Sequence, residues 1–163
     1  MTTLRSNRHG SAVVTLPNDT EIVITRSFDA PRDLVFKAFT DPDAVPHWWG
    51  WRESETIVHE LEARPGGRWR FVSRDKDGNE YGFHGVYHDA TAPERIVYTF
   101  EFEGMPGHVL LETTTFEEQD GRTLVTSLSV FQSVADRDGM LQSGMESGAA
   151  ESMDRLAEYL ARS

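Results

Sequence analysis

The hydrophobic period of the chain changes near residue 133, and this change limits the folds that it can adopt. Between residues 55 and 131, short segments alternate apolar and polar side chains, with tight turns such as Asp77-Gly78 and Asp120-Gly121 between them. A period of two is typical of strands with one buried face, and short turns join antiparallel neighbours. From residue 133 to 162, apolar or small residues recur every three or four positions, which predicts one long amphipathic helix. Because a sheet with one apolar face must be covered, the helix is expected to pack against it.

Two short helices are predicted between the first strand and the later ones. Asp29-Ala30-Pro31 can begin a helix, since Asp caps and Pro fits the first turn. Asp41-Pro42 repeats this signal for a shorter helix that ends at 48–50. The fold class is therefore α+β, with a curved antiparallel sheet of six to seven strands wrapped around a long C-terminal helix. The strands are expected at 20–28, 55–63, 68–73, 80–89, 95–103, 108–117 and 123–131.

Length and composition fit one domain with little affinity for polyanions. The 163 residues carry a net charge of −11, which argues against binding to nucleic acid or to an anionic membrane. There is no Cys, so thiol nucleophiles and Cys-ligated metals are excluded. No apolar run reaches the roughly 18 residues of a membrane span, and the N-terminus has no signal-peptide pattern. We expect a cytoplasmic monomer or homodimer, with a flexible arm at 1–19 that lies along the sheet and a single domain at 20–163.

Many aromatic side chains are expected on the concave face of the sheet. Most such residues simply form a core, but concave apolar walls with a few polar groups also form small-molecule sites. Gly144 and Gly148 lie four residues apart on the predicted helix. They allow either a close approach of the helix to the sheet or a space left for a guest molecule. If the space is real, the cavity is expected to be lined by Trp48, Trp49, Trp69, Phe71, Phe83, Tyr87, Tyr98, Phe100, Glu112, Thr114, Met145 and Ala149.

No catalytic set can be assigned from the sequence, and no cofactor is expected. Arg26 shares a strand face with Ile24 and Phe28, so a buried Arg26 needs a carboxylate such as Glu112 or a ligand. Both side chains could equally emerge at the rim of the sheet. Glu112, Arg26, His84 and Tyr87 are the candidate acid–base groups if they face inward. His84 and His88 share a strand face, but their Cα atoms would lie about 13 Å apart, too far to chelate one metal ion.

Four ordered blocks of the sequence resemble a known superfamily. The chain is similar to START-like (SRPBCC, Bet v-like) proteins, and in particular to the branch named after the C-terminal domain of activators of the heat-shock-chaperone (Hsp) ATPase. The resemblance extends over about residues 20–162 and implies a helix-grip fold. The position after Gly148 is often Trp in this branch, whereas it is Ala149 here. The matching blocks are residues 28–42 with the Trp-Trp-Gly motif at 48–50, residues 64–69, residues 93–99, and residues 143–148 with 154–156.

The resemblance implies three alternative functions. The first is the binding of a small apolar or amphipathic molecule in a cavity between the sheet and the helix. The second is an enzyme of the polyketide cyclase, aromatase or hydrolase type that acts in the same cavity. The third, and least favoured, is a co-factor of a chaperone ATPase, because residues 1–19 cannot replace the separate N-terminal domain with which those activators contact the chaperone.

Overall fold

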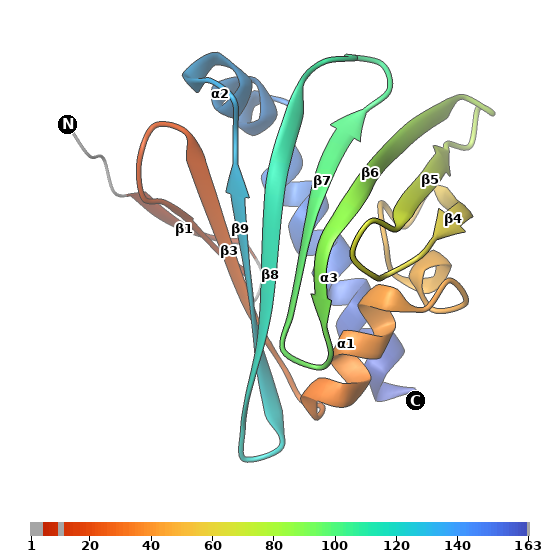
Figure 1. The fold of residues 1–163 in the computed structure, drawn as a ribbon, viewed down its shortest axis with the longest axis vertical. Coiled ribbons are helices and arrows are strands. Elements are labelled where there is room, and N and C mark those ends of the chain that lie inside the picture. The colour runs from red at the N-terminus through yellow and green to blue at the C-terminus, as the bar shows by residue number, and fades with distance from the viewer. Residues whose placement is uncertain (1–4, 10–11, 163) are drawn as a thin grey trace.

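The computed structural model describes residues 5–9 and 12–162, and it is an α+β fold in which a curved sheet wraps around the C-terminal helix (Figure 1). This arrangement confirms the predicted fold class. The elements in chain order are β1 (Arg5–His9), β2 (Ala12–Leu16), β3 (Glu21–Phe28), α1 (Arg32–Thr40), the 3-10 turn η1 (Val45–His47), β4 (Glu55–Leu61), β5 (Arg68–Arg74), β6 (Glu80–Thr91), β7 (Arg95–Phe102), β8 (Val109–Gln119), β9 (Arg122–Val130), α2 (Val134–Gln142) and α3 (Met145–Ala161).

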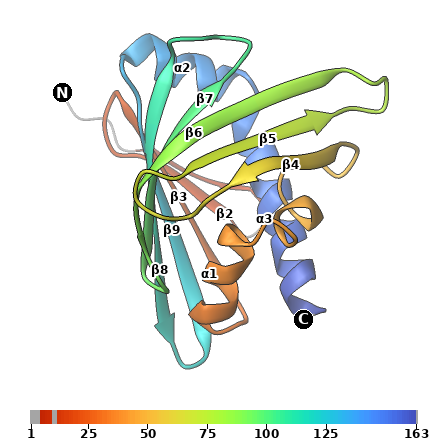
Figure 2. The same ribbon diagram turned by 45° about the vertical axis from the view of Figure 1, so that its right-hand side comes forward.

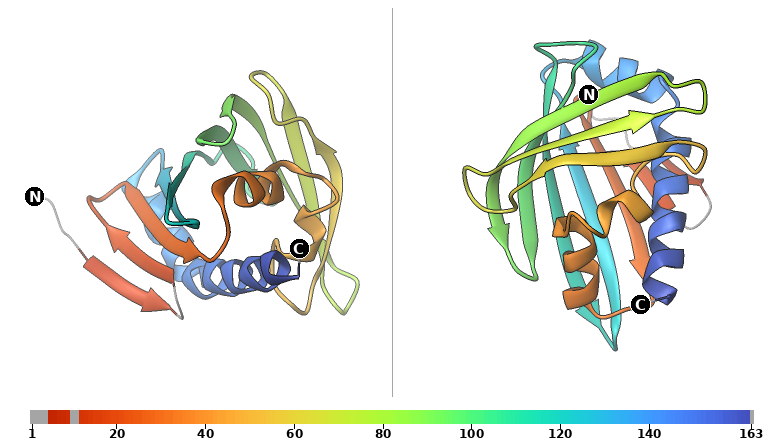
Figure 3. Two further views of the ribbon diagram at one scale, coloured as in Figure 1. Left: turned by 90° about the horizontal axis from the view of Figure 1, so that it is seen from below. Right: turned by 90° about the vertical axis from the view of Figure 1, so that its right-hand side faces the viewer.

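All neighbouring strands in the sheet are antiparallel. The order is β1-β2-β3-β9-β8-β7-β6-β5-β4, so β4 to β9 form a meander and β3 closes against the last strand, β9. The β4–β6 part curls away from β3, β8 and β9 (Figure 2). Seen from below, α3 crosses the open side of the curved sheet, and α1 lies inside the curve beside it (Figure 3). The meander therefore supplies a concave wall, and α3 supplies the opposite one.

Part of the arm expected at 1–19 lies along the sheet as strands, and residues 1–4 and 10–11 of this arm lie outside the described residues. Residues 12–16 form β2, and residues 5–9 form β1 at the edge of the sheet. Ala12, Val14 and Leu16 alternate with half-buried residues and are themselves buried. Val14 and Leu16 pack with Ile22, so burial of this apolar face holds β2 against β3. The sheet consequently has nine described strands, more than the six to seven expected.

The long C-terminal helix is also interrupted, contrary to expectation. Gly144 adopts a left-handed backbone conformation with φ of +86° and separates α2 from α3. Glycine occupies this region at little cost, so the chain can turn there. No residue of α2 is buried, whereas α3 buries Leu156 and Leu160 in the core. Only α3, from Met145 onward, therefore acts as the central helix.

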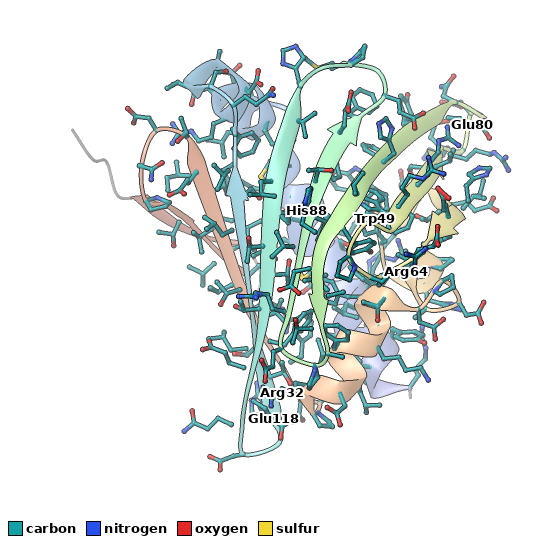
Figure 4. All side chains as sticks on the ribbon, viewed as in Figure 1. Arg32, Trp49, Arg64, Glu80, His88 and Glu118 are labelled. Carbon is teal, nitrogen blue, oxygen red and sulfur yellow. The ribbon has the colours of Figure 1, made fainter. Side chains whose placement is uncertain are left out.

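The start of α1 is stabilised by a residue far away in the sequence. Asp29, the expected cap, is exposed, and its Oδ1 lies 3.7 Å from Nη1 of Arg122. Pro31 occupies the N-cap position of α1, where no side chain accepts a capping hydrogen bond. Instead, the backbone N–H of Arg32 donates to the Glu118 carboxylate over 2.7 Å (Figure 4). A carboxylate near a helix N-terminus is favourable because of the helix dipole. The end of the β8–β9 hairpin thus fixes α1 against the sheet.

Candidate functional site

A cavity of about 350 Å³ lies between the concave face of the sheet, the segment after η1, and α3. This volume falls in the range of small-molecule sites. Its wall is mostly apolar and aromatic, and serine hydroxyls and one carboxyl interrupt it. The lining residues are Ile24, Phe39, Val45, Trp48, Trp49, Gly50, Trp51, Trp69, Phe71, Ser73, Phe83, Tyr87, Ile96, Tyr98, Phe100, Leu110, Glu112, Ser127, Ser129, Phe131, Met140, Gly144, Met145, Gly148, Ala149, Ser152 and Met153.

Every residue predicted from the sequence to line the cavity does so except Thr114. Thr114 is completely buried, and its hydroxyl lies 3.3 Å from that of Ser127. It therefore packs within the wall and does not face the cavity. Ser127, Ser129 and Trp51 are among the lining residues that the sequence did not identify. The two serines alternate with Val125 and Phe131 along one strand, a signal that could have placed them on the inner face.

The aromatic wall is held by hydrogen bonds and close ring contacts. The Trp69 indole crosses β6 and donates from Nε1 to the Thr99 carbonyl over 3.1 Å. Gly85 makes this possible, because a Cβ there would meet that carbonyl oxygen at 1.8 Å. Trp49, labelled in Figure 4, packs edge-on against Phe71 with ring centroids 5.2 Å apart. The wall is thus a fixed surface rather than a set of loose side chains.

Glu112 supplies the one carboxyl group among the described residues that line the cavity. It lies in a cross-strand row with Ser129 on β9 and Tyr98 on β7. The Ser129 hydroxyl donates to Oε1 of Glu112, which is half-buried as a residue and lines the cavity. Burial raises the pKa of Glu112 to about 7, an effect that the Ser129 hydrogen bond partly opposes. At neutral pH the carboxyl therefore exchanges between its charged and neutral forms.

The phenol beside Glu112 is strongly perturbed as well. Burial raises the pKa of Tyr98 well above its usual value, and the nearby charge of Glu112 adds to this effect. Burial likewise raises the pKa of Tyr87, whose ring centroid lies 5.6 Å from that of Tyr98. Both phenols consequently remain neutral near pH 7, so they can donate hydrogen bonds but cannot act as bases.

Arg26 and His84 do not join this site. Arg26 is inside, as one alternative required, but its Nη2 pairs with Asp154 on α3 over 3.2 Å and not with Glu112. Its guanidinium lies over the Phe28 ring, 4.9 Å from the centroid. His84 faces the convex side of the sheet, where its Nδ1 lies 2.9 Å from Glu103.

The cluster on the convex face has a structural explanation. Arg70 makes two hydrogen bonds to Glu103, at 2.8 and 2.9 Å. The Arg70 hydrogen bonds, followed by that of His84, lower the pKa of Glu103 to about 2. Gly82 leaves room for this pair, since a Cβ there would meet Glu103 Oε1 at 2.2 Å. Of the four candidate acid–base residues, Glu112 and Tyr87 therefore remain inside the cavity.

The segment 47–52, called the rim segment below, contributes residues 48–51 to the cavity wall and is held to α3 by hydrogen bonds. Ser152 accepts from the Gly50 N–H and donates to the Trp48 carbonyl. Arg155 donates to the carbonyls of His47, Trp49, Gly50 and Trp51 at 3.0 to 3.4 Å.

The two glycines that lie four residues apart, Gly144 and Gly148, have different roles. Gly144 and Gly148 both line the cavity, but Gly144 lies at the break before α3. A Cβ on Gly148 would meet the Trp51 ring at 3.1 Å, so the close approach is to this segment and not to the sheet. The space beside α3 is therefore left by Ala149 and Gly144, whereas Gly148 accommodates Trp51.

Replacing Arg155 by Met is expected to loosen the rim. The change removes donors to four carbonyls while keeping a side chain of similar length, and we expect the free energy of unfolding to fall by about 1–2 kcal/mol in urea titrations. Arg52→Met is the control, because Arg52 pairs with Glu158 in an exposed position. This control substitution should lower the free energy of unfolding by less than about 0.5 kcal/mol. Equal effects of the two variants would contradict the role given to Arg155.

Among the side chains that the structure describes, those of residues 12–162, no group of three or more His, Cys, Asp or Glu is arranged to hold a metal ion. Over the same described part of the chain, none of the helices combines the length and apolar character that crossing a bilayer requires.

Comparison with solved structures shows the same fold in bacterial proteins. A protein of Rhodobacter sphaeroides superposes with a TM-score of 0.89 at 22% identity, covering 94% of this chain and 99% of that one. A protein of Mycobacterium smegmatis gives a TM-score of 0.80 at 23% identity, covering 97% of both chains. DynU16, a protein in the dynemicin biosynthetic locus, gives 0.69 at 23% identity, covering 89% of this chain and 48% of its own.

The family assignment comes from the sequence itself. A search of curated proteins found no match. Residues 29–161, however, match the family described as "Activator of Hsp90 ATPase homolog 1-like protein". The match extends from the residue after β3 to the last residue of α3, and this confirms the resemblance found in the four sequence blocks. The chain therefore belongs to the Activator of Hsp90 ATPase homolog 1-like family, within the START-like superfamily.

Proposed function

We propose that this protein binds a small apolar or amphipathic molecule in the cavity between the sheet and α3. The observation that carries the proposal is the cavity of about 350 Å³, whose aromatic walls surround a single carboxyl group. Apolar pockets with few, convergent polar groups are the usual form of small-molecule sites. Ala149 and Met145 contribute small or flexible side chains on the helix side, where bulky groups would fill the space.

Native mass spectrometry of protein purified from its own host tests this proposal. A retained small molecule, released on denaturation, is the expected result. A panel of apolar and amphipathic compounds should also raise the melting temperature, because a ligand that binds only the folded state stabilises it. No retained molecule, together with no stabilisation by any compound of the panel, would reject the proposal.

A second candidate function is catalysis in the same cavity, and Glu112 is the observation that favours it. A carboxyl with a pKa of about 7 can give or take a proton near neutral pH. The neutral phenols of Tyr87 and Tyr98 could orient a carbonyl oxygen beside it. Cyclase, aromatase and hydrolase chemistry all need such a proton-transfer group. The occurrence of DynU16 in a biosynthetic locus is compatible with this candidate.

Product analysis separates the two candidates. If the protein is an enzyme, a bound compound incubated with it should change in mass or in chromatographic behaviour, and Glu112→Gln should stop the change without abolishing binding. If it is a carrier, the compound should be recovered unaltered from both forms. Conversion that survives in the Gln variant would remove Glu112 from the chemistry.

A further inference from the structure

We infer that the ligand carries a basic amine at its polar end, joined to an apolar or aromatic body. This inference rests on the proposed function and specifies the class of ligand for the same cavity. Among the described residues that line the cavity, Glu112 is the one side chain able to carry a full charge near neutral pH, and no Arg, Lys or His lines it. The polar end of the ligand must therefore be compatible with a carboxyl group.

Three cations described above, Arg26, Arg155 and His84, each have a partner outside the cavity. Arg26 pairs with Asp154 and does not line the cavity. Arg155 donates its hydrogen bonds to the carbonyls of the rim segment. His84 lies on the opposite face of the sheet beside Glu103. Where Glu112 is ionised, an anionic ligand such as a fatty acid would bring a second negative charge next to it, and the described lining residues include no Arg, Lys or His to offset that charge. Like charges in a desolvated site are costly.

The carboxyl of Glu112 accepts fewer hydrogen bonds than it can. Ser129 donates to Oε1, and among the described residues no further hydrogen bond to Glu112 is formed, so this lining residue keeps free acceptor positions on Oε2. An ionised carboxylate offers about four acceptor sites, whereas an ammonium group offers three donors and no acceptor. The two groups are complementary, and a hydrogen bond between opposite charges is about twice as strong as one between neutral groups.

Aromatic rings beside Glu112 favour a cation further. Tyr98 lies directly across from Glu112 in the strand register, and its ring centroid lies 5.6 Å from that of Tyr87 and 5.9 Å from that of Trp69. Ring faces attract cations, and desolvation strengthens this attraction. An alkyl or aromatic body attached to the amine would then lie along the wall formed by Phe71, Phe83 and Phe100.

Three ligands of matched shape test the inference: phenylbutylamine, phenylbutanol and phenylbutanoate. Isothermal titration at about pH 8, where Glu112 is ionised, should rank the amine first and the carboxylate last. We expect the amine to bind at least about tenfold more tightly than the alcohol, and the alcohol at least about tenfold more tightly than the carboxylate. The preference for the amine should disappear in Glu112→Gln, whereas affinity for the alcohol should stay within about threefold. Glu117→Gln, an exposed change on the same strand, should keep the full preference.

The outcomes separate this inference from the proposed function. If the alcohol or the carboxylate binds as tightly as the amine, or if the preference survives in Glu112→Gln, the inference is overturned while cavity binding stands. If none of the three binds, the inference is overturned, and the absence of any retained molecule in native mass spectrometry would then reject the proposed function too. The wild-type ranking decides the question by itself should the Gln variant fail to fold.

Discussion

The Ala149→Trp variant is expected to lose ligand binding while keeping its fold. Ala149 lies on the first half of α3, is half-buried and faces the cavity. An indole at this position would project into the space that we assign to the ligand. We expect affinity for any cavity ligand to fall at least about 100-fold, which corresponds to about 2.7 kcal/mol. The free energy of unfolding should change by no more than about 1 kcal/mol, because the added group enters a void and not a packed core.

Ser147→Trp is the matched control for this variant. Ser147 lies two residues earlier on the same helix, is exposed and does not line the cavity. Titration of one ligand into both variants, with urea unfolding in parallel, separates filling of the cavity from a general effect of an added indole. Unchanged binding in Ala149→Trp with an intact fold would mean that ligands bind elsewhere. Equal losses in the two variants would mean that the cavity is not the cause.

Much of the fold could be predicted from hydrophobic period. The strands from β3 to β9 follow alternation between turn signals, and their predicted bounds agree with the structure to within a few residues. The failures have local causes. β2 is only five residues long, and its buried residues Ala12, Val14 and Leu16 alternate with half-buried ones. Its burial depends on contact with Ile22, which belongs to the next strand. The break at Gly144 depends on one backbone conformation, whereas the helical spacing continues past it.

The site was harder to predict, because the alternation of side chains along a strand shows which face of the sheet a residue lies on. It does not show where on that face the residue lies. Arg26, Glu112 and Thr114 all point to the concave face, yet the strand register decides their surroundings. Arg26 lies level with Val125, near Asp154, while Glu112 lies level with Ser129 and the cavity. Thr114 is two residues from Glu112 and already lies within the packed wall. The composition of the inner face could thus be read from the sequence, but the boundary between core and cavity could not.

The stability of the protein is expected to fall as the pH rises from about 4.5 to 7, and Glu112 is the reason. Its pKa is about 7 in the folded protein, against an ordinary value of 4.5. Between these values the folded state binds more protons than the unfolded state, so the free energy of unfolding decreases with increasing pH. A difference of about 2.5 in pKa corresponds to about 3–4 kcal/mol, which is an upper limit because Glu112 is only half-buried.

Glu112→Gln should remove this pH dependence. Urea unfolding of both forms is expected to give free energies within about 1 kcal/mol of each other at about pH 5, with the variant more stable by up to about 3 kcal/mol at about pH 8. Glu103→Gln is the control, because Glu103 has a pKa of about 2 and loses its stabilising contribution only as the pH falls below 4.5. Its curve should run parallel to that of the wild type from about pH 5 to 8. Parallel curves for wild type and Glu112→Gln would show that the carboxyl titrates as it does in water, and neither the amine-binding role nor a proton-transfer role near neutral pH would then have a physical basis.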